Sequence, residues 1–544
     1  MTVQDLLLLA VPGLPLALGA ACLLRPVRRR MLSLLAIAPL PGVLAALVAA
    51  NAPAVALGDG LYRPTLALDL PGAVLLGIAA LLWSAAGAYA ATYQRGAPNE
   101  GRFVACWLLA LAGCLGVFVA ADMALLYAML ALMTLGATGL VFHDESAAAR
   151  RAAGVYLGLA LFGESLVLVG MVLAVSATPG GSLLIGDAVA ALPSAPGRHV
   201  ILGLLIAGFG IKAGLVPLHV WMPLAHAAAP MPASAVLSGA VVKAGIIGLI
   251  RFVPVDPSLA GAGNLLAAAG MFTALYAVAV GVTQSHPKVV LAYSSVSQMG
   301  FVAAVIGMGV ATADARTPLL AAFYAGHHVL VKGALFLLVG VVAATGRGRL
   351  RGALVLAALL AAGLGGLPFT GGAIAKYAVK DPLGEGWAAT AAAVSAIGTT
   401  LLMLHFLRRV SAGCADAPDA RASAGLALPW LTMAIAALVL PWVLYGTLSL
   451  GEAASTLTAK ALWATLWPVL AGATLLYALA RAESLLPRIP QGDIAVVIDG
   501  AVRRAVAVNG AFVRADGALR QWPVASALLV VIAIVLAAAL AGRH

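Results

Sequence analysis

Charge is scarce in this sequence. Asp, Glu, Lys and Arg make up only 10% of the 544 residues, whereas a soluble globular domain contains about 25%. Hydrophobic residues make up 63%, and the mean hydropathy is +1.05. This composition excludes an ordinary soluble domain. Apolar runs of 18 or more residues predict membrane-spanning helices, and the short alternating strands of a membrane barrel are not seen.

Cysteine is also scarce, and no two cysteines form a CxxC pair. The four cysteines are Cys22, Cys106, Cys114 and Cys414. This spacing argues against an iron–sulfur or zinc site, and we expect isolated thiols packed as small apolar groups. The sequence also lacks a phosphate-binding Walker loop, a GxSxG motif and a dinucleotide fingerprint. We therefore expect no cofactor, no catalytic residue and no redox or hydrolytic centre in this chain.

The apolar runs predict an all-α, polytopic membrane protein with 14–16 helices. The first run has no basic start and is followed by arginines, which favours a membrane helix over a cleaved signal peptide. Sixteen ranges are expected: 4–24, 31–51, 70–93, 103–120, 122–142, 152–176, 199–224, 232–253, 258–283, 289–311, 317–345, 349–378, 388–411, 427–450, 460–482 and 523–541.

Basic residues gather in the short connections between these helices. The net charge of +12 invites a nucleic-acid interpretation, but alternating connections place most Lys and Arg on one side, as the positive-inside rule describes. That side is expected to be cytoplasmic, with both termini outside. The localisation predicted is the plasma membrane of a prokaryote, and no nucleic-acid partner is expected.

Four lysines interrupt the apolar segments: Lys212, Lys243, Lys332 and Lys376. A charge at the bilayer centre costs about 2.5–3.5 kcal/mol on insertion scales, so intramembrane lysines usually mark ion or proton paths. The one clear acid in the predicted membrane core is Glu164. It lies in the helix preceding that of Lys212, and the two are natural partners, either as a functional pair or as a static structural one.

Histidines supply groups that titrate near neutral pH. His328 and Lys332 are four residues apart and share a helix face, with His327 beside them. His219 and His226 follow Pro217. We interpret His327, His219 and His226 as possible proton relays, with packing histidines as the alternative. A metal site would require carboxylate or cysteine co-ligands, which these segments lack, so no metal is expected.

Two expected helices are interrupted. Pro217 breaks the helix at 199–224, and Gly366 and Pro368 break the helix at 349–378. Broken membrane helices occur where the freed backbone lines a cavity, and paired breaks mark ion sites in transporters. The breaks lie five helices apart, which predicts two inverted five-helix repeats.

Four regions follow from this pattern. The N-terminal helices 1–3 occupy 1–102, the repeats occupy 103–253 and 258–411, and the C-terminal helices occupy 427–544. Within the last region, a polar stretch near 491–521 mixes apolar residues with arginines. It predicts an amphipathic cytoplasmic segment, with an ordinary loop as the alternative.

The run GIKAGLVPLHVWMPLAHAAAPMPASAVLSGAVVKAGIIGLIR (210–251) resembles the antiporter-like membrane subunits of respiratory complex I and Mrp antiporters. The runs KVVLAYSSVSQMGF (288–301), HHVLVKGALFLLVG (327–340) and GGLPFTGGAIAK (365–376) fit the same family in the same order. The wording PLAHAAAPMPASAVLSG is most similar to the membrane subunits of hydrogenase-4 and formate hydrogenlyase.

This resemblance implies a proton path along a central polar axis at mid-membrane. By motif position it assigns Lys212, Lys243, Lys376 and the pair His328 and Lys332 to the family's path. Three positions depart from the family: Ala131 replaces a glutamate, Ser238 a histidine, and His286 an aspartate.

The leading functional prediction is a proton-translocating, antiporter-like subunit of a multisubunit energy-converting complex. Its partners would be other membrane subunits, the lipid bilayer and a soluble cytoplasmic module that drives translocation; the ion is a proton or Na⁺. One alternative is a cation/proton antiporter subunit of Mrp type. Another is a membrane subunit coupled to a soluble zinc protein for inorganic-carbon uptake. The last is a degenerate structural anchor, which Ala131 favours.

Overall fold

The computed structural model describes residues 2–22, 24, 30–58, 62–481, 487, 489–494 and 496. The chain divides into two compact units, Met1–Gln491 and Gly492–His544, and the helices and strands named below belong to the first. The expected helix at 523–541 lies outside the described residues, as does nearly all of the expected amphipathic segment at 491–521.

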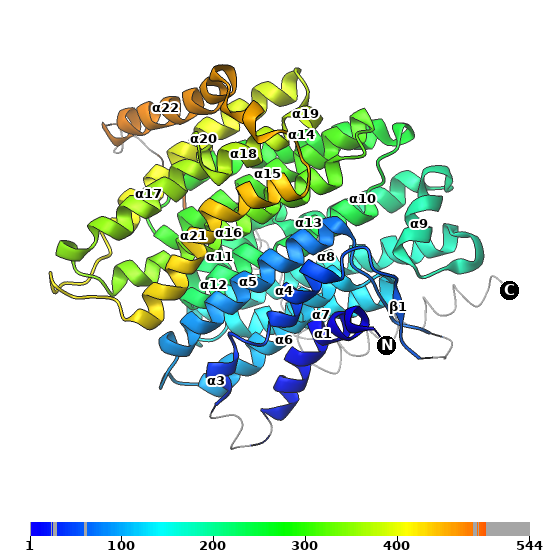
Figure 1. The fold of residues 1–544 in the computed structure, drawn as a ribbon, viewed down its shortest axis with the longest axis horizontal. Coiled ribbons are helices and arrows are strands. Elements are labelled where there is room, and N and C mark those ends of the chain that lie inside the picture. Colours follow the sequence, from blue (N-terminus) through cyan, green and yellow to red (C-terminus); the bar gives the residue numbers. More distant parts are fainter. Residues whose placement is uncertain are drawn as a thin grey trace, which may run out of the picture. The chain divides into compact units, whose positions relative to one another are not determined.

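The described residues are mostly helical, with one short hairpin (Figure 1). Up to residue 252 the elements are α1 (Val3–Ala21), α3 (Met31–Leu34), α4 (Leu40–Val48), β1 (Val55–Ala56), β2 (Thr65–Leu66), α5 (Leu70–Tyr93), α6 (Glu100–Val119), α7 (Met123–Val141), α8 (Ala147–Ala177), η1 (Pro179–Gly181), α9 (Ile185–Ala191), η2 (Leu192–Ser194), α10 (Arg198–Ala213), η3 (Leu218–Val220), α11 (Trp221–Ala228), α12 (Met231–Val236), η4 (Leu237–Val241) and α13 (Lys243–Phe252).

The remaining elements are η5 (Pro257–Leu259), α14 (Ala260–Gly281), α15 (Pro287–Thr312), α16 (Thr317–Ala343), η6 (Arg347–Arg349), α17 (Arg351–Gly365), α18 (Gly371–Ala378), α19 (Lys380–Leu383), α20 (Trp387–Ser411), α21 (Ala424–Thr447), η7 (Ala453–Leu457) and α22 (Ala459–Arg481).

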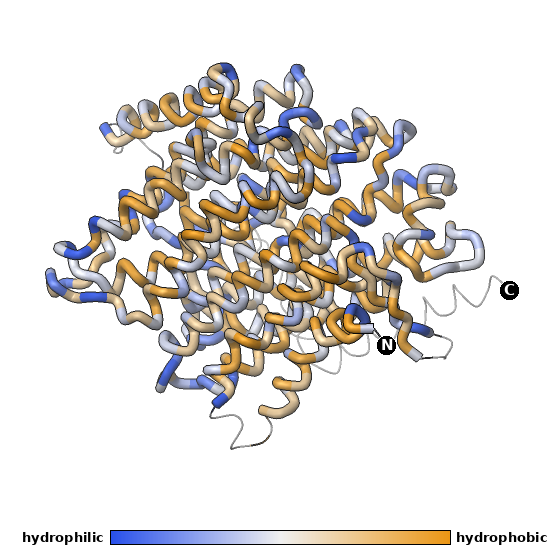
Figure 2. Tube along the Cα trace, viewed as in Figure 1, coloured by the Kyte–Doolittle hydropathy of each residue, from blue (hydrophilic) through white to orange (hydrophobic). Residues whose placement is uncertain are grey.

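Thirteen helical spans in the described residues are long and apolar enough to cross a membrane, counting Arg198–Ala228 and Met231–Phe252 as one span each. Figure 2 shows apolar residues along these helices and hydrophilic residues at their ends. The all-α, polytopic fold class is confirmed. The two inverted five-helix repeats and the four-region division stay predictions.

One helix that was expected to be continuous is interrupted. The range 31–51 was predicted as a single helix, but α3 ends at Leu34 and α4 begins at Leu40. Pro39 lies at the boundary, and Pro41 is near the start of α4. A proline inside a helix removes a hydrogen bond and clashes with the carbonyl four residues earlier, so the regular helix is interrupted here.

Helix starts are fixed by side-chain caps. Asp122 accepts from Leu125 N at 2.8 Å and begins α7, and Ser146 accepts from Ala149 N at 3.0 Å and begins α8. Asp122 also accepts from Thr65 N and from the hydroxyl of Tyr62, which joins the hairpin to α7. Burial beside this carboxylate raises the pKa of Tyr62 to about 12.

Three helical segments are enclosed by the others. The most apolar windows of Met231–Phe252, α15 and α16 are 100% buried, whereas those of α1 and α22 are only 17% buried. Close backbone approach makes this enclosure possible: a Cβ on Gly300 of α15 would lie 2.6 Å from the carbonyl oxygen of Gly270 in α14. Side chains on the enclosed segments therefore face protein rather than lipid.

Candidate functional site: a chain of buried lysines and histidines

Glu164 and Lys212 form a buried ion pair. Glu164 lies midway along α8 and Lys212 near the end of α10, and their side chains are 3% and 5% exposed. Lys212 Nζ is 2.5 Å from Glu164 Oε1. A lone charge in this apolar surrounding would be costly, and each group provides the counter-charge of the other. The predicted contact between the two residues is confirmed.

Thr134 of α7 completes this pair and was missed by the sequence reasoning. Its hydroxyl donates to Glu164 Oε1 and accepts from Lys212 Nζ, each at 2.5 Å. It lies three residues after Ala131, on the helix where the family usually has its glutamate. Threonine is common in membrane helices, and no spacing in the sequence distinguishes this one.

The break after Lys212 is confirmed. Helix α10 ends at Ala213, Gly214 has φ +81°, and the backbone is non-helical as far as Pro217. Its freed Val216 N–H meets a polar side chain, because it donates to Thr273 Oγ1 at 3.2 Å. Gly214 takes the left-handed conformation without the cost that a Cβ would bring.

A second irregularity follows in η4, where Leu237–Val241 form a π-helical turn that the sequence did not predict. The turn brings the Ser238 carbonyl within 3.2 Å of Lys243 Nζ, which donates to it. The Ser238 hydroxyl meets Ser295 Oγ of α15 at 2.7 Å. Such π-turns are frequent at functional sites because they redirect backbone groups.

Lys243 and His328 are in direct contact between two enclosed helical segments. Both are fully buried, and Lys243 Nζ lies 2.6 Å from His328 Nδ1. A protonated lysine can donate to this nitrogen only if the imidazole is neutral there. His328 Nε2 is buried and has no hydrogen-bond partner among the described residues.

Lys332 lies one turn further along α16 and is also fully buried. Its Nζ donates to the Leu291 carbonyl of α15 at 3.0 Å. None of the described residues forms an ion pair with Lys243 or Lys332. Two amines thus lie on enclosed helices without a paired carboxylate among the described residues.

The other predicted relay histidines each pack against different neighbours. His219 packs edge-on against the rings of Tyr276 and Tyr293. His226 of α11 stacks near Phe336, with 4.8 Å between ring centroids, and neither of its ring nitrogens has a partner among the described residues. His327 of α16 lies against α18, since a Cβ on Gly372 would be 3.2 Å from its Cε1.

The second predicted break is also confirmed, between α17 and α18. Gly366 has φ +110°, and residues 366–370, which include Pro368, are non-helical. The Lys376 side chain folds back over this break, so that a Cβ on Gly366 would lie 2.9 Å from Lys376 Cδ. Lys376 Nζ is 5.4 Å from the centre of the Phe301 ring, a cation–π contact.

Helix contacts connect these groups in sequence. Helices α10 and α13 touch next to their lysines, where a Cβ on Gly245 would lie 2.5 Å from Ala213 N. Helices α13 and α16 meet at Lys243 and His328, and α16 meets α18 at His327. The lysines of α10, α13, α16 and α18 therefore lie on successively contacting helices. Their equal depth and a continuous polar row stay predictions.

A buried polar cluster near Lys376 was not predicted. Tyr324 donates to Gln298 Oε1 at 2.7 Å, and Gln298 Nε2 donates to Thr399 Oγ1 at 2.9 Å. The Tyr324 ring packs against Phe301, over which Lys376 lies. The cluster places groups that can exchange hydrogen bonds between α15, α16 and α20.

Lys288 precedes the expected helix at 289–311 and so belongs to the basic connections expected on the cytoplasmic side. In the structure it lies in the first turn of α15 and is 5% exposed. Its Nζ donates to the Ala229 carbonyl at 2.6 Å, which satisfies the end of α11. Lys288 is buried because the freed carbonyl after α11 needs a hydrogen-bond donor, and the lysine supplies it.

The arrangement can bind and pass protons between nitrogen and oxygen groups. It contains amines, imidazoles, hydroxyls and one carboxylate. Among the described residues no group of three His, Cys, Asp or Glu is placed to hold a metal ion. His328 is the junction because Lys243 contacts it and Lys332 shares its helix face.

Comparisons with known proteins support the family resemblance of the sequence motifs. A family model described as NADH:quinone oxidoreductase/Mrp antiporter, TM, matches residues 120–404, which include every predicted path residue. Hydrogenase-4 component B of Escherichia coli K12 is 30% identical over 297 residues, covering 51% of this chain and 43% of that protein. The chain therefore spans less than half the length of this relative.

Two further comparisons extend this likeness. NADH-quinone oxidoreductase subunit N of Desulforudis audaxviator is 29% identical over 365 residues, which cover 63% of this chain and 71% of that protein. A structure of the Mrp complex from Dietzia sp. DQ12-45-1b superposes with a TM-score of 0.78 at 22% identity, covering 99% of this chain and 63% of that chain. At this identity the likeness shows a common fold.

Proposed function

The chain belongs to the NADH:quinone oxidoreductase/Mrp antiporter transmembrane family, and we propose that it is a proton-translocating subunit of a larger energy-converting complex. The thirteen candidate spans within the described residues identify it as a multi-pass membrane protein. The proposed location is the plasma membrane of a prokaryote.

The observation that carries this proposal is the Lys243–His328 contact on enclosed helices. A static structural role would be served better by an apolar pair, since burying an amine without a counter-charge is costly. A proton carrier needs a donor and an acceptor within hydrogen-bond reach, which the 2.6 Å separation provides.

The proposed path starts at the Glu164–Lys212 pair, continues through Lys243, His328 and Lys332, and ends at Lys376. When Lys212 releases its bond to Glu164, the proton can move towards Lys243 and His328. If Lys243 and His328 were both protonated, their two positive charges would repel strongly in a low-dielectric interior. A proton on one of these side chains therefore favours release of the proton from the other. His219, His226 and His327 are the proposed auxiliary relays.

The proposed partners are other membrane subunits and a soluble cytoplasmic module. This rests on the relatives, which are a component of hydrogenase-4, a subunit of NADH-quinone oxidoreductase and an Mrp complex. A cation/proton antiporter of Mrp type is the second candidate, supported by the fold shared with the Mrp complex.

Proton movement is tested in inverted membrane vesicles containing the assembled complex, with a pH-sensitive dye and with Na⁺ present or replaced by choline. We expect Lys212→Ala and Lys332→Ala to abolish acidification while the complex assembles. The double variant Glu164→Gln/Lys212→Ala checks that an unpaired carboxylate is not the cause of the lost acidification.

Arg349→Ala is the control, because this exposed residue makes only a loose 3.8 Å pair with Asp419. Wild-type acidification in both lysine variants would remove the lysines from the path.

Purification of the complex from its host separates the remaining alternatives. Co-eluting iron–sulfur or nickel subunits support coupling to a redox reaction, and small membrane subunits with Na⁺-dependent acidification support the antiporter. A soluble zinc protein supports inorganic-carbon uptake. Assembly without proton movement in the wild type identifies a structural anchor.

A further inference from the structure

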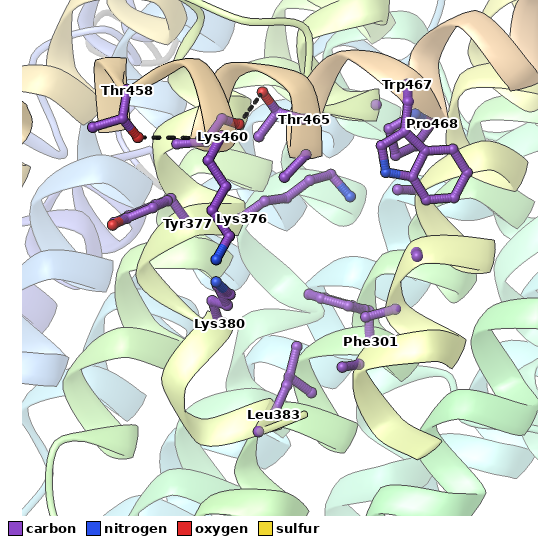
Figure 3. A pocket seen from close by; sticks show the side chains of 18 residues that line it. Phe301, Lys376, Tyr377, Lys380, Leu383, Thr458, Lys460, Thr465, Trp467 and Pro468 are labelled. Atoms are coloured by element: carbon purple, nitrogen blue, oxygen red, sulfur yellow. Dashed lines mark hydrogen bonds between the residues drawn. The ribbon is translucent and has the colours of Figure 1, made fainter. Parts of the chain in front are cut away.

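A large cavity lies beside the last lysine of the proposed path. Its volume is about 520 Å³, within the usual range of ligand pockets. Helices α18, α19, α20 and α22 and the ring of Phe301 form its wall. Six of the 18 lining residues are alanines, and Figure 3 shows the labelled side chains around the cavity.

Among the residues that the structure describes, three lysines and no carboxylate line this cavity. They are Lys376, Lys380 and Lys460, and none forms an ion pair with another described residue. Figure 3 shows Lys380 of α19 and Lys460 of α22 extending towards one another. Two like charges that converge on one space repel unless an anion lies between them.

The first turn of α22 adds to this positive field. Thr458, Lys460 and Ala461 line the cavity, and Thr458 Oγ1 accepts from Ala461 N at 3.3 Å. Backbone N–H groups at the start of a helix carry partial positive charge, which favours an anion there. The lysines and the helix start therefore act on the same space.

The cavity lies at the level where helices end. Lys380 follows the end of α18, Trp387 begins α20, and Lys460 is the second residue of α22. Trp387 is 49% exposed and Trp463 is 62% exposed, as expected for tryptophans at the membrane–water interface. This is the level of lipid headgroups.

We propose that this cavity binds the phosphate group of an anionic phospholipid. The phosphate lies between the Lys380 and Lys460 ammonium groups, and an acyl chain runs along the alanines of α20 and α22 and past Trp467. Lysine binds phosphate as a compact point charge and needs no planar geometry. Inorganic phosphate shares this chemistry but would leave the apolar wall uncovered. The proposal does not depend on proton translocation.

The test uses the assembled complex in phosphatidylcholine nanodiscs that contain a minority of brominated lipid, which quenches nearby tryptophan. The Trp467 contribution is the difference between wild type and Trp467→Phe. We expect brominated phosphatidylglycerol to quench Trp467 several-fold more than brominated phosphatidylcholine at the same fraction. The double variant Lys380→Gln/Lys460→Gln should lose this excess, and Lys380→Arg/Lys460→Arg should keep it.

Inorganic phosphate is the second arm. Added phosphate should leave the excess quenching unchanged if the lipid occupies the site. A change of Trp467 emission on adding phosphate to phosphatidylcholine nanodiscs, lost in the glutamine variant, would overturn the lipid source and leave a soluble-phosphate site. Equal quenching by both brominated lipids, together with no response to phosphate, would overturn the proposal.

Discussion

The hydroxyl of Thr134 stabilises the bonded arrangement of the buried ion pair. It binds both the Glu164 carboxylate and the Lys212 amine. A hydrogen bond to a charged group contributes about 1.5–3 kcal/mol when buried. The hydroxyl therefore stabilises the pair in its closed arrangement and offers a site through which a proton can pass.

We expect Thr134→Val to lower both the stability of the complex, by about 1.5–3 kcal/mol, and the initial rate of vesicle acidification. Valine keeps the shape but neither donates nor accepts. Thermal unfolding of the purified complex and the dye assay measure the two effects. Thr138→Val is the matched control, because Thr138, one turn along the same helix, donates only to the Thr134 carbonyl at 2.7 Å. Equal behaviour of the two variants would show that the Thr134 hydroxyl does not serve the pair.

Residue types alone singled out the lysines and Glu164 as candidates, because a charge in an apolar run is conspicuous, and the spacing from Lys332 added His328. They did not identify Thr134, Gln298 or Tyr324, whose polar groups are ordinary in membrane helices. Their roles depend on the rotation of each helix about its axis, which is fixed by packing between distant segments. The same applies to Lys288, whose burial depends on the carbonyl left free after α11.

At the scale of elements, the break between α17 and α18 positions Lys376. Gly366 has φ +110°, a conformation that a side chain disfavours by about 1–2 kcal/mol. An added Cβ would also lie 2.9 Å from Lys376 Cδ. The glycine is thus required both by the turn and by the lysine folded over it.

Gly366→Ala should lower the free energy of unfolding by about 1–2 kcal/mol and displace the Lys376 amine. Gly352→Ala, near the start of the same helix, provides the comparison, because a Cβ there meets nothing within 4 Å. Alanine at Gly352 should be neutral or stabilising, since glycine is the weaker helix former. Differential scanning fluorimetry measures both variants. A thermal midpoint for Gly366→Ala at or above that of Gly352→Ala would contradict this account of the break.

Proline and glycine clusters predicted both broken helices, because they disrupt the hydrogen-bond ladder directly. The π-turn at Leu237–Val241 carried no such signal. Its sequence, LSGAV, is compatible with a regular helix, and its neighbours are distant in sequence: the Ser238 hydroxyl meets Ser295 Oγ of α15, and a Cβ on Gly239 would lie 3.5 Å from the Val329 carbonyl oxygen of α16. The interruption at Pro39 has a local cause, the proline itself. The apolar run around it is nevertheless long enough to be predicted as one continuous helix.

At the scale of the whole molecule, hydropathy predicted the helical spans well because lipid requires long apolar helices. It could not predict which helices are enclosed, since α15 and α16 are less apolar than α8 and α21, which are much less buried. Enclosure depends on long-range packing. One contact illustrates this, because it joins segments 182 residues apart.

Arg251 at the end of α13 pairs with Asp69, the N-cap residue of α5, through two hydrogen bonds of 3.0 and 3.1 Å. It also donates to the carbonyls of Val117, Phe118 and Ala120, which end α6. Burial alone would raise the pKa of Asp69, but the Arg251 guanidinium and the Gly72 N–H outweigh burial and lower it below its ordinary value of 3.8. One guanidinium therefore holds three helix ends together.

A carboxyl whose pKa is lowered by folding stabilises the protein above its unfolded pKa, and this stabilisation is lost as the pH falls through the lower folded value. We expect Asp69→Asn to destabilise the complex at pH 7 by about 1 kcal/mol, a reduced figure because the Asp69 side chain is 45% exposed to solvent. The difference from wild type should shrink as the pH falls below 3.8. Thermal midpoints measured across this range test the expectation. Asp419→Asn provides the control, since Asp419 is 91% exposed and its pair with Arg349 is loose. A difference that stayed constant with pH would show that the ionised Asp69 carboxylate does not stabilise this junction.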